Sequence, residues 1–238
     1  FALLEALRQI ADECPTVKVL SVGPALDEEY QHRVLEKRRQ LQLEERFLFA
    51  GFQPDVTPFY GLADAFVLPS VLEGFGLVKL EAMLHGLPLI LTRVGDSARL
   101  IEDGDIGLLV PDVYEDLCDI SVERIHELLA DENPPNAPAL AEAMMAFVRH
   151  PDQWREAGRR GREKVLSRFT REQALKSYEA LFIREVGLAQ KRRGDGVLRR
   201  ENRLLREQTT LWARVVDEKE RAIREKNGQF LELDKRLH

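Results

Sequence analysis

The residues best suited to chemistry lie in one stretch of the chain, 69–86, which reads PSVLEGFGLVKLEAMLHG. Two glutamates, Glu73 and Glu81, flank a Gly-x-Gly turn that leads into a predicted helix. The first N–H groups of a helix have no partner within it, and the helix dipole makes that end positive. The spacing therefore predicts an anion site suited to a phosphate, made by the backbone of Gly76, Leu77 and Val78.

The two glutamates are suited to binding hydroxyl groups beside such a phosphate. Glu81 lies four residues after Leu77, and its side chain leans back toward the start of the helix. Its carboxylate would repel a phosphate directly above it, so a ribose beside the diphosphate is the better partner. Glu73 precedes the turn and is free to face a second polyol. The spacing suits a sugar nucleotide, although a tight turn and a solvated glutamate would each explain one feature taken singly.

Short apolar strands alternate with helices on either side of this stretch. Strands are predicted at 17–22, 46–50, 65–68, 87–92 and 106–110. Helices are predicted at the N-terminus, over 28–41, 55–62 with Asp55 as N-cap, and 77–85, with a helical turn at 97–101 and only helix from 113 on. This alternation predicts an α/β fold with a parallel sheet covered by helices on both faces. Ligands bind at the carboxyl ends of such strands, which is where the glutamates lie.

Specific motifs in the chain resemble the retaining glycosyltransferases of the GT-B fold, family GT4. The pattern PSxxEGFGLxxLEAMxxGxP, with its E-x7-E pair, carries most of the resemblance. Further similar segments are the strand-end turn 22–24, the FAGF segment 49–52, the DGxxGLLV segment 103–110, and SRFT at 167–170 with Tyr178. The resemblance covers about residues 1–190 and implies the C-terminal, donor-binding, Rossmann-like half of a GT-B fold.

The resemblance implies a role for each matching residue. Glu81 would bind the ribose, and the N–H groups of Gly76, Leu77 and Val78 would bind the phosphates. Glu73, Gly74 and Phe75 would contact the donor sugar, with Glu73 as the catalytic residue, and Phe52 and Gly23 would lie in the nucleotide part of the donor site.

The reaction implied by the resemblance is sugar transfer with retention from a UDP- or GDP-sugar to a glycan or glycolipid, as in polysaccharide biosynthesis. The acceptor would attack an oxocarbenium-like centre from the front side. No cofactor and no bound metal are expected, because a helix end and basic side chains neutralise the leaving diphosphate.

Two departures from the family pattern qualify this interpretation. The family's GGxxE segment is replaced by Gly95-Asp96-Ser97-Ala98-Arg99, which alters the rim of the donor pocket. Arg99 is either a ligand contact or a surface charge. The family's phosphate-binding Arg and Lys, its first strand and its N-terminal half with a catalytic His would precede Phe1, and His85 does not replace that histidine. We therefore expect no turnover by this chain alone. A non-catalytic, glycosyltransferase-like binding or scaffold module is the alternative.

Charge divides the chain into two predicted domains. Residues 191–238 carry a net charge of +5, whereas residues 1–190 carry −11. Within 197–237, apolar residues recur every seven positions in two registers. One runs through Val216, Ile223, Phe230 and Leu237, and the other runs through Leu198, Leu205, Trp212 and Leu233 but is interrupted by Lys219 and Lys226. This pattern predicts a coiled-coil-like helix that pairs with a second copy or with a helix of the missing half. A single solvated helix is the alternative.

Composition also bears on location and partners. The apolar runs are too short to cross a membrane, no signal peptide is visible, and two lone cysteines, Cys14 and Cys118, fit a reducing compartment. We expect a cytoplasmic protein. The basic tail is also compatible with peripheral contact at the inner membrane face. Nucleic acid is not an expected partner, because aromatic residues are few and both charge signs are mixed.

Overall fold

The computed structural model describes residues 1–25, 27–102, 105–112, 121, 124, 127–128, 130–192, 206 and 210. Contacts divide the chain into two compact units, Phe1–Thr170 and Arg171–His238. The predicted domain boundary at 190/191 lies further along the chain. The glycines at 194 and 196 that mark it, and nearly all of the heptad pattern at 197–237, fall outside the described residues.

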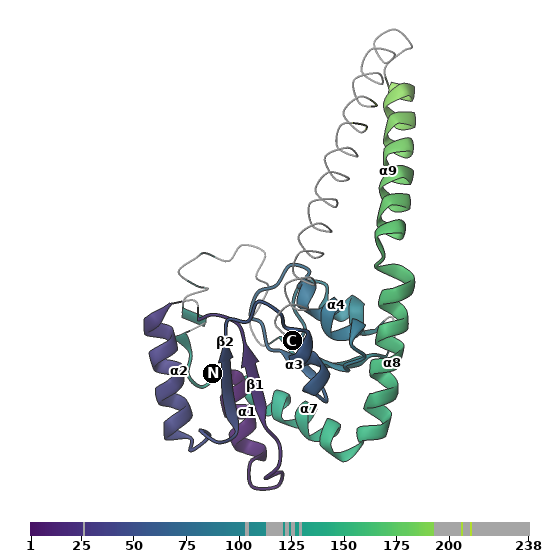
Figure 1. Cartoon of the computed structure of the whole chain (residues 1–238). Helices are drawn as coiled ribbons and strands as arrows, with labels where there is room; N and C mark the ends of the chain where they lie inside the picture. The colour runs from purple at the N-terminus through teal and green to yellow at the C-terminus, as the bar shows by residue number, and fades with distance from the viewer. Residues whose placement is uncertain are drawn as a thin grey trace, which may run out of the picture. The chain divides into compact units, whose positions relative to one another are not determined.

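The first unit alternates strands and helices, as the sequence pattern predicts (Figure 1). Its strands are β1 (Val19–Val22), β2 (Phe47–Gly51), β3 (Phe66–Leu68), β4 (Leu89–Thr92) and β5 (Gly107–Val110). Its helices are α1 (Ala2–Ile10), α2 (Glu28–Gln40), α3 (Thr57–Leu62), α4 (Leu77–Leu84), α5 (Ser97–Glu102), α7 (Ala137–Arg149) and α8 (Pro151–Arg168). The second unit contains α9 (Arg171–Arg192).

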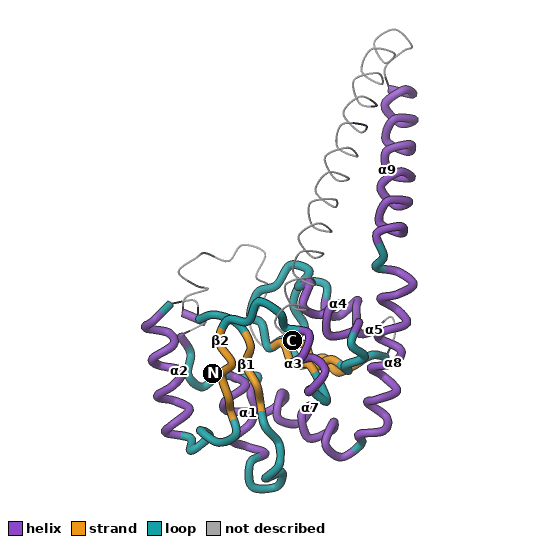
Figure 2. Tube along the Cα trace, viewed as in Figure 1, coloured by secondary structure: helices purple, strands orange, loops and turns teal. Residues whose placement is uncertain are grey.

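All pairings among these strands are parallel, which confirms the predicted fold class, but the strands form two sheets instead of one (Figure 2). β1 pairs with β2, placing Val19 opposite Phe47. β4 lies between β3 and β5, placing Leu89 opposite both Phe66 and Gly107. Among the described residues, β1 and β3 do not pair with each other.

Strand β4 is buried on both faces, which explains its unbroken apolar sequence. Leu89 and Leu91 point into a core formed with α4, α5 and α8, where Met83 and Val165 are buried. Ile90, between them, points into a second core formed with α1 and α7. Successive side chains of a strand face opposite sides, so this alternation places helices on both faces of the sheet.

The predicted elements exist, but their bounds differ at the ends. All five strands begin later than predicted: the strand predicted from position 87, for example, begins at Leu89. Helix α3 begins at Thr57 with Val56 as its N-cap, so the prediction of Asp55 as N-cap is wrong. Asp55 Oδ1 instead accepts a hydrogen bond of 2.9 Å from the N–H of Thr57, an Asx-type turn that precedes the helix.

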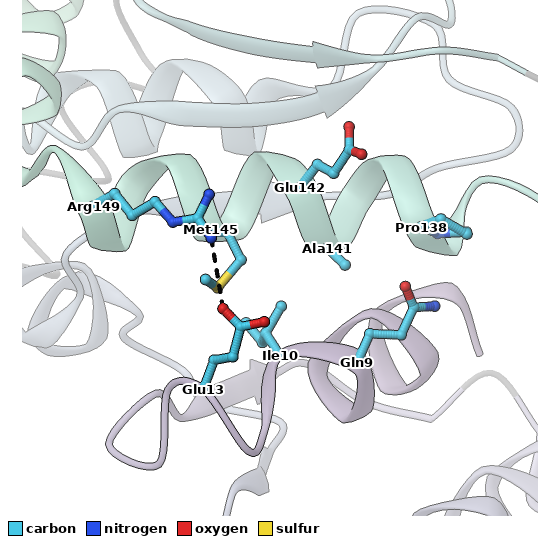
Figure 3. Close-up of a pocket in the computed structure, with 8 residues that line it drawn as sticks. All are labelled: Gln9, Ile10, Glu13, Pro138, Ala141, Glu142, Met145 and Arg149. Atoms are coloured by element: carbon cyan, nitrogen blue, oxygen red, sulfur yellow. Dashed lines mark ion pairs between the residues drawn. The ribbon is translucent and has the colours of Figure 1, made fainter.

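Helices α1 and α7 pack together and leave a groove of about 540 Å³ at their junction (Figure 3). An ion pair of 3.5 Å between Glu13 and Arg149 crosses it. Its lining residues are Gln9, Ile10, Glu13, Pro138, Ala141, Glu142, Met145 and Arg149. None of them is a predicted site residue.

In the second unit, α9 exposes large apolar side chains, including Leu175, Tyr178, Phe182 and Ile183. Among the described residues, no helix combines the length and apolar character that a membrane span requires.

Candidate donor site

The candidate site lies where β3 and β4 end, because their parallel pairing brings both carboxyl ends to one edge. The loop after β3 carries Glu73 to Gly76 and leads into α4, while the loop after β4 carries Gly95 and Asp96. Thr92 Oγ1 donates a hydrogen bond of 2.5 Å to the carbonyl of Ser70 and so ties the two loops together at their base.

Helix α4 begins directly after the Gly-x-Gly turn, as the sequence predicts. Gly76 is its N-cap, with φ of +67°, and makes no side-chain cap. The first turn contains no acidic residue, and its first backbone hydrogen bond runs from the N–H of Lys79 to the carbonyl of Gly76. Leu77 and Val78 are exposed. The N–H groups at the start of the helix are therefore open to a ligand.

Glu73 lies directly beside this turn. A Cβ atom built on Gly76 would lie 3.0 Å from Glu73 Cδ and 3.2 Å from its Oε2. The positive φ of Gly76 favours glycine at this position, and a Cβ atom there would also press on the Glu73 side chain. Gly74 and Phe75 complete the loop and are exposed, and the Phe75 ring packs at 5.9 Å from that of Phe169.

Glu81 is exposed on α4 and is already engaged by a residue to which the sequence analysis assigns no role. Tyr60 of α3 donates a hydrogen bond of 2.9 Å from its hydroxyl to Glu81 Oε2. The Tyr60 ring also stacks on His85, with centroids 5.0 Å apart. Burial and the neighbouring carboxylate both raise the pKa of Tyr60. Nothing in the local pattern identifies Tyr60, because it reaches Glu81 only through the packing of α3 against α4.

Gly23 and Phe52 lie together at the ends of β1 and β2. The N–H of Gly23 donates a hydrogen bond of 2.9 Å to the carbonyl of Gly51, and Phe52 is 70% exposed. They belong to the sheet of β1 and β2, whereas the two glutamates belong to the edge of the other sheet. Within the described ranges, no hydrogen bond, ion pair or ring contact joins the two groups.

The departure at Asp96 has a partner in the structure. Lys79 of α4 is completely buried, and its Nζ lies 2.6 Å from Asp96 Oδ1 and 3.4 Å from Ser97 Oγ. The sequence pattern predicts no role for Lys79. Two features of the sequence could have indicated this pair. A basic residue stands at a helix position that otherwise faces a core, and an acidic residue follows in the next strand-end loop. Arg99 is exposed.

Comparisons with known proteins match both the sequence and the fold of the chain. The family model described as "Glycosyl transferases group 1" matches residues 2–131. N-acetyl-alpha-D-glucosaminyl L-malate synthase of Bacillus anthracis is 30% identical over 149 residues, which are 63% of this chain and 33% of that protein. The chain thus spans about a third of the length of this relative.

Solved structures share the fold. Sucrose-phosphate synthase of Thermosynechococcus elongatus superimposes with a TM-score of 0.57 and 28% identity, over 76% of this chain and 43% of that one. HepE of Anabaena, solved in complex with UDP, superimposes with a TM-score of 0.60 and 24% identity, over 75% and 44% of the two chains. With the parallel sheets, the open helix N-terminus and its flanking glutamates, these matches show that the chain belongs to the group 1 glycosyltransferases and has a GT-B-type, Rossmann-like fold.

Proposed function

We propose that this chain binds the nucleotide-diphosphate sugar of a retaining glycosyltransferase, with UDP or GDP as the nucleotide. The observation that carries the proposal is the N-terminus of α4, which has Gly76 in the left-handed region, no side-chain cap, and glutamates on both sides. Backbone donors at a helix N-terminus favour a diphosphate, while carboxylates beside it favour neutral hydroxyl groups. A sugar nucleotide presents both.

The proposed roles follow the order of groups along the donor. Glu81 binds the ribose, the first turn of α4 binds the diphosphate, and Glu73 with Gly74 and Phe75 holds the sugar. In the reaction, the bond between the anomeric carbon and the diphosphate oxygen breaks, and an acceptor hydroxyl oxygen bonds to the same face. The hydroxyl proton passes to the departing diphosphate. The positive end of α4 stabilises the charge that develops on this leaving group.

Calorimetric titration of the chain with UDP and with GDP tests the donor site. UDP is the first ligand to use, because HepE, which shares the fold, was solved with UDP. Glu81→Ala should weaken nucleotide binding about tenfold, because hydrogen bonds to a charged carboxylate are lost. Glu142→Ala is the matched control, since Glu142 is an exposed glutamate on α7. The proposal fails if the chain binds neither UDP nor GDP.

The proposed acceptor is a glycan or a glycolipid. A cytoplasmic site of action, with contact at the inner membrane face, is proposed with it. The buried free thiol of Cys14 is consistent with a reducing compartment.

A non-catalytic, nucleotide-sugar-binding module is the second candidate. It is favoured by Asp96, because this residue departs from the family pattern and places a partly exposed carboxylate in the loop that touches Glu73. Nucleotide binding without sugar transfer, in the chain and in a fusion of the chain to the N-terminal half of a group 1 glycosyltransferase, would support this candidate over the enzyme.

A further inference from the structure

Lys79 occupies a position on α4 where an apolar side chain is expected. It shares the buried face of the helix with Ala82 and Met83, and its side chain is completely inaccessible to solvent. A buried ammonium group is costly unless it is paired. Asp96 provides that pairing at 2.6 Å, and it stands where the family pattern has glycine.

The pair joins α4, which directly follows the loop after β3, to the loop after β4. Lys79 belongs to the first turn of α4, and Asp96 to the loop after β4. A second contact lies next to it. Gly95 has φ of +55°, and a Cβ atom there would come within 2.2 Å of the Glu73 carbonyl oxygen and 2.4 Å of that of Gly74. The loop after β4 therefore rests on the backbone of Glu73 and Gly74, and the ion pair holds it there.

The same lysine lies under the phosphate-binding turn. A Cβ atom on Gly76 would lie 2.9 Å from Lys79 Cε and 3.0 Å from Glu73 Cδ, so these two groups flank the same point. Lys79 Nζ also lies 5.7 Å from the centroid of the Phe75 ring. Its aliphatic chain therefore supports the turn from below, while its charge is directed to Asp96.

We propose that the buried Lys79–Asp96 pair is a positioning device that sets the place of Glu73 and the 95–96 rim, and hence affinity for the sugar half of the donor. The inference rests on the proposed function for the identity of the ligand. Lys79 is a positioning residue, because its buried ammonium acts through Asp96 and the loop. Glu81 lies two residues further along α4, beside Tyr60, and the ribose half should depend little on the pair.

The first test needs no ligand. Hydrogen exchange of the full chain should show loss of protection in 70–76 and 93–97 for Lys79→Met, because the two loops lose their connection. Lys79→Met/Asp96→Asn should recover part of this protection, since it leaves no uncompensated charge. Unchanged protection of both segments in Lys79→Met would overturn the positioning claim, whatever the outcome of nucleotide binding.

The second test compares UDP-glucose with UDP in the same variants. Lys79→Met should lower the affinity for UDP-glucose about fivefold more than the affinity for UDP. Lys37→Met is the matched control, because Lys37 is also buried and its Nζ pairs with Glu5 at 2.6 Å between α2 and α1. That variant should lose stability without changing the ratio of the two affinities.

The two tests separate failure of the inference from failure of the proposed function. The pair would be only a general stabilising contact if Lys79→Met lowered the affinities for UDP-glucose and UDP equally. The same would follow if Lys37→Met changed the ratio of these two affinities as much as Lys79→Met does. Wild-type chain that binds neither ligand would contradict the proposed function, while hydrogen exchange would still decide whether the pair holds the loops.

Discussion

At the scale of single residues, the contact between Tyr60 and Glu81 has a consequence for stability at high pH. Burial and the carboxylate raise the pKa of Tyr60 above the value of 10.0 for an unperturbed tyrosine. The folded state therefore favours the neutral phenol. This contribution to stability is fully present below pH 10 and is lost as the pH rises from 10 toward the higher pKa of the folded state.

Tyr60→Phe should accordingly flatten the loss of stability above pH 10. Melting temperatures of the two proteins between pH 8 and pH 11 would measure this, with the difference between them isolating Tyr60 from other titrating groups. Tyr30 is a useful comparison, because burial also raises its pKa and Tyr30→Phe leaves the Glu81 contact intact. Parallel pH profiles for wild type and Tyr60→Phe would contradict the expectation.

At the scale of elements, helix α8 packs against the turn that ends α4 through a glycine. A Cβ atom on Gly158 would lie 1.9 Å from the carbonyl oxygen of Gly86 and 3.1 Å from Pro88 Cδ. Gly158→Ala must therefore displace α8 or the turn. We expect a loss of about 1–3 kcal/mol in the free energy of unfolding, measured by denaturant titration.

Gly161→Ala is the control in the same helix. A Cβ atom there would meet Met83 Cγ at 3.6 Å, an ordinary van der Waals distance. Because alanine favours the helix more than glycine does, this variant should be neutral or more stable. Destabilisation of equal size in the two variants would show that the effect belongs to the helix and not to its contact with the turn.

At the scale of the whole molecule, the heptad pattern of 197–237 predicts self-association. Phe230→Glu places a charge in one of the two apolar registers and should shift the chain from dimer to monomer in sedimentation velocity. Gln229→Glu adds the same charge outside both registers and should leave the dimer intact. Wild-type chain that sediments as a monomer at high micromolar concentration would rule out self-pairing and favour either a solvated helix or pairing with a helix of another protein.

Much of the fold and part of the site were predictable from local pattern. The apolar run at β4 predicted a strand covered on both faces, and Leu89 and Ile90 do face different cores. Gly76 predicted a turn that leads into a helix with free N–H groups. This was predictable because a left-handed residue and an uncapped first turn are local properties of the chain.

The contacts around the glutamates were not predictable in this way. Tyr60 meets Glu81 across 21 positions of sequence, and Lys79 meets Asp96 across 17. Each pairing depends on how a helix lies on the sheet, and side-chain type alone specifies no partner. The start of α3 was predicted too early, at Asp55, for a simpler reason. An Asx-type turn and an N-cap use the same side-chain oxygen, so the sequence does not distinguish them.

The sequence by itself determined the α/β class, the family resemblance and the position of the Gly-x-Gly turn between Glu73 and Glu81. These depend on periodicity and on motifs read along the chain. Only the tertiary structure decided that the strands form two sheets, that Glu81 is held by Tyr60, and that Asp96 is neutralised by a buried lysine. The physical reason is that the effect of the Asp96 charge on the site depends on which residue pairs with it. That partner is set by the packing of α4 against the loop after β4.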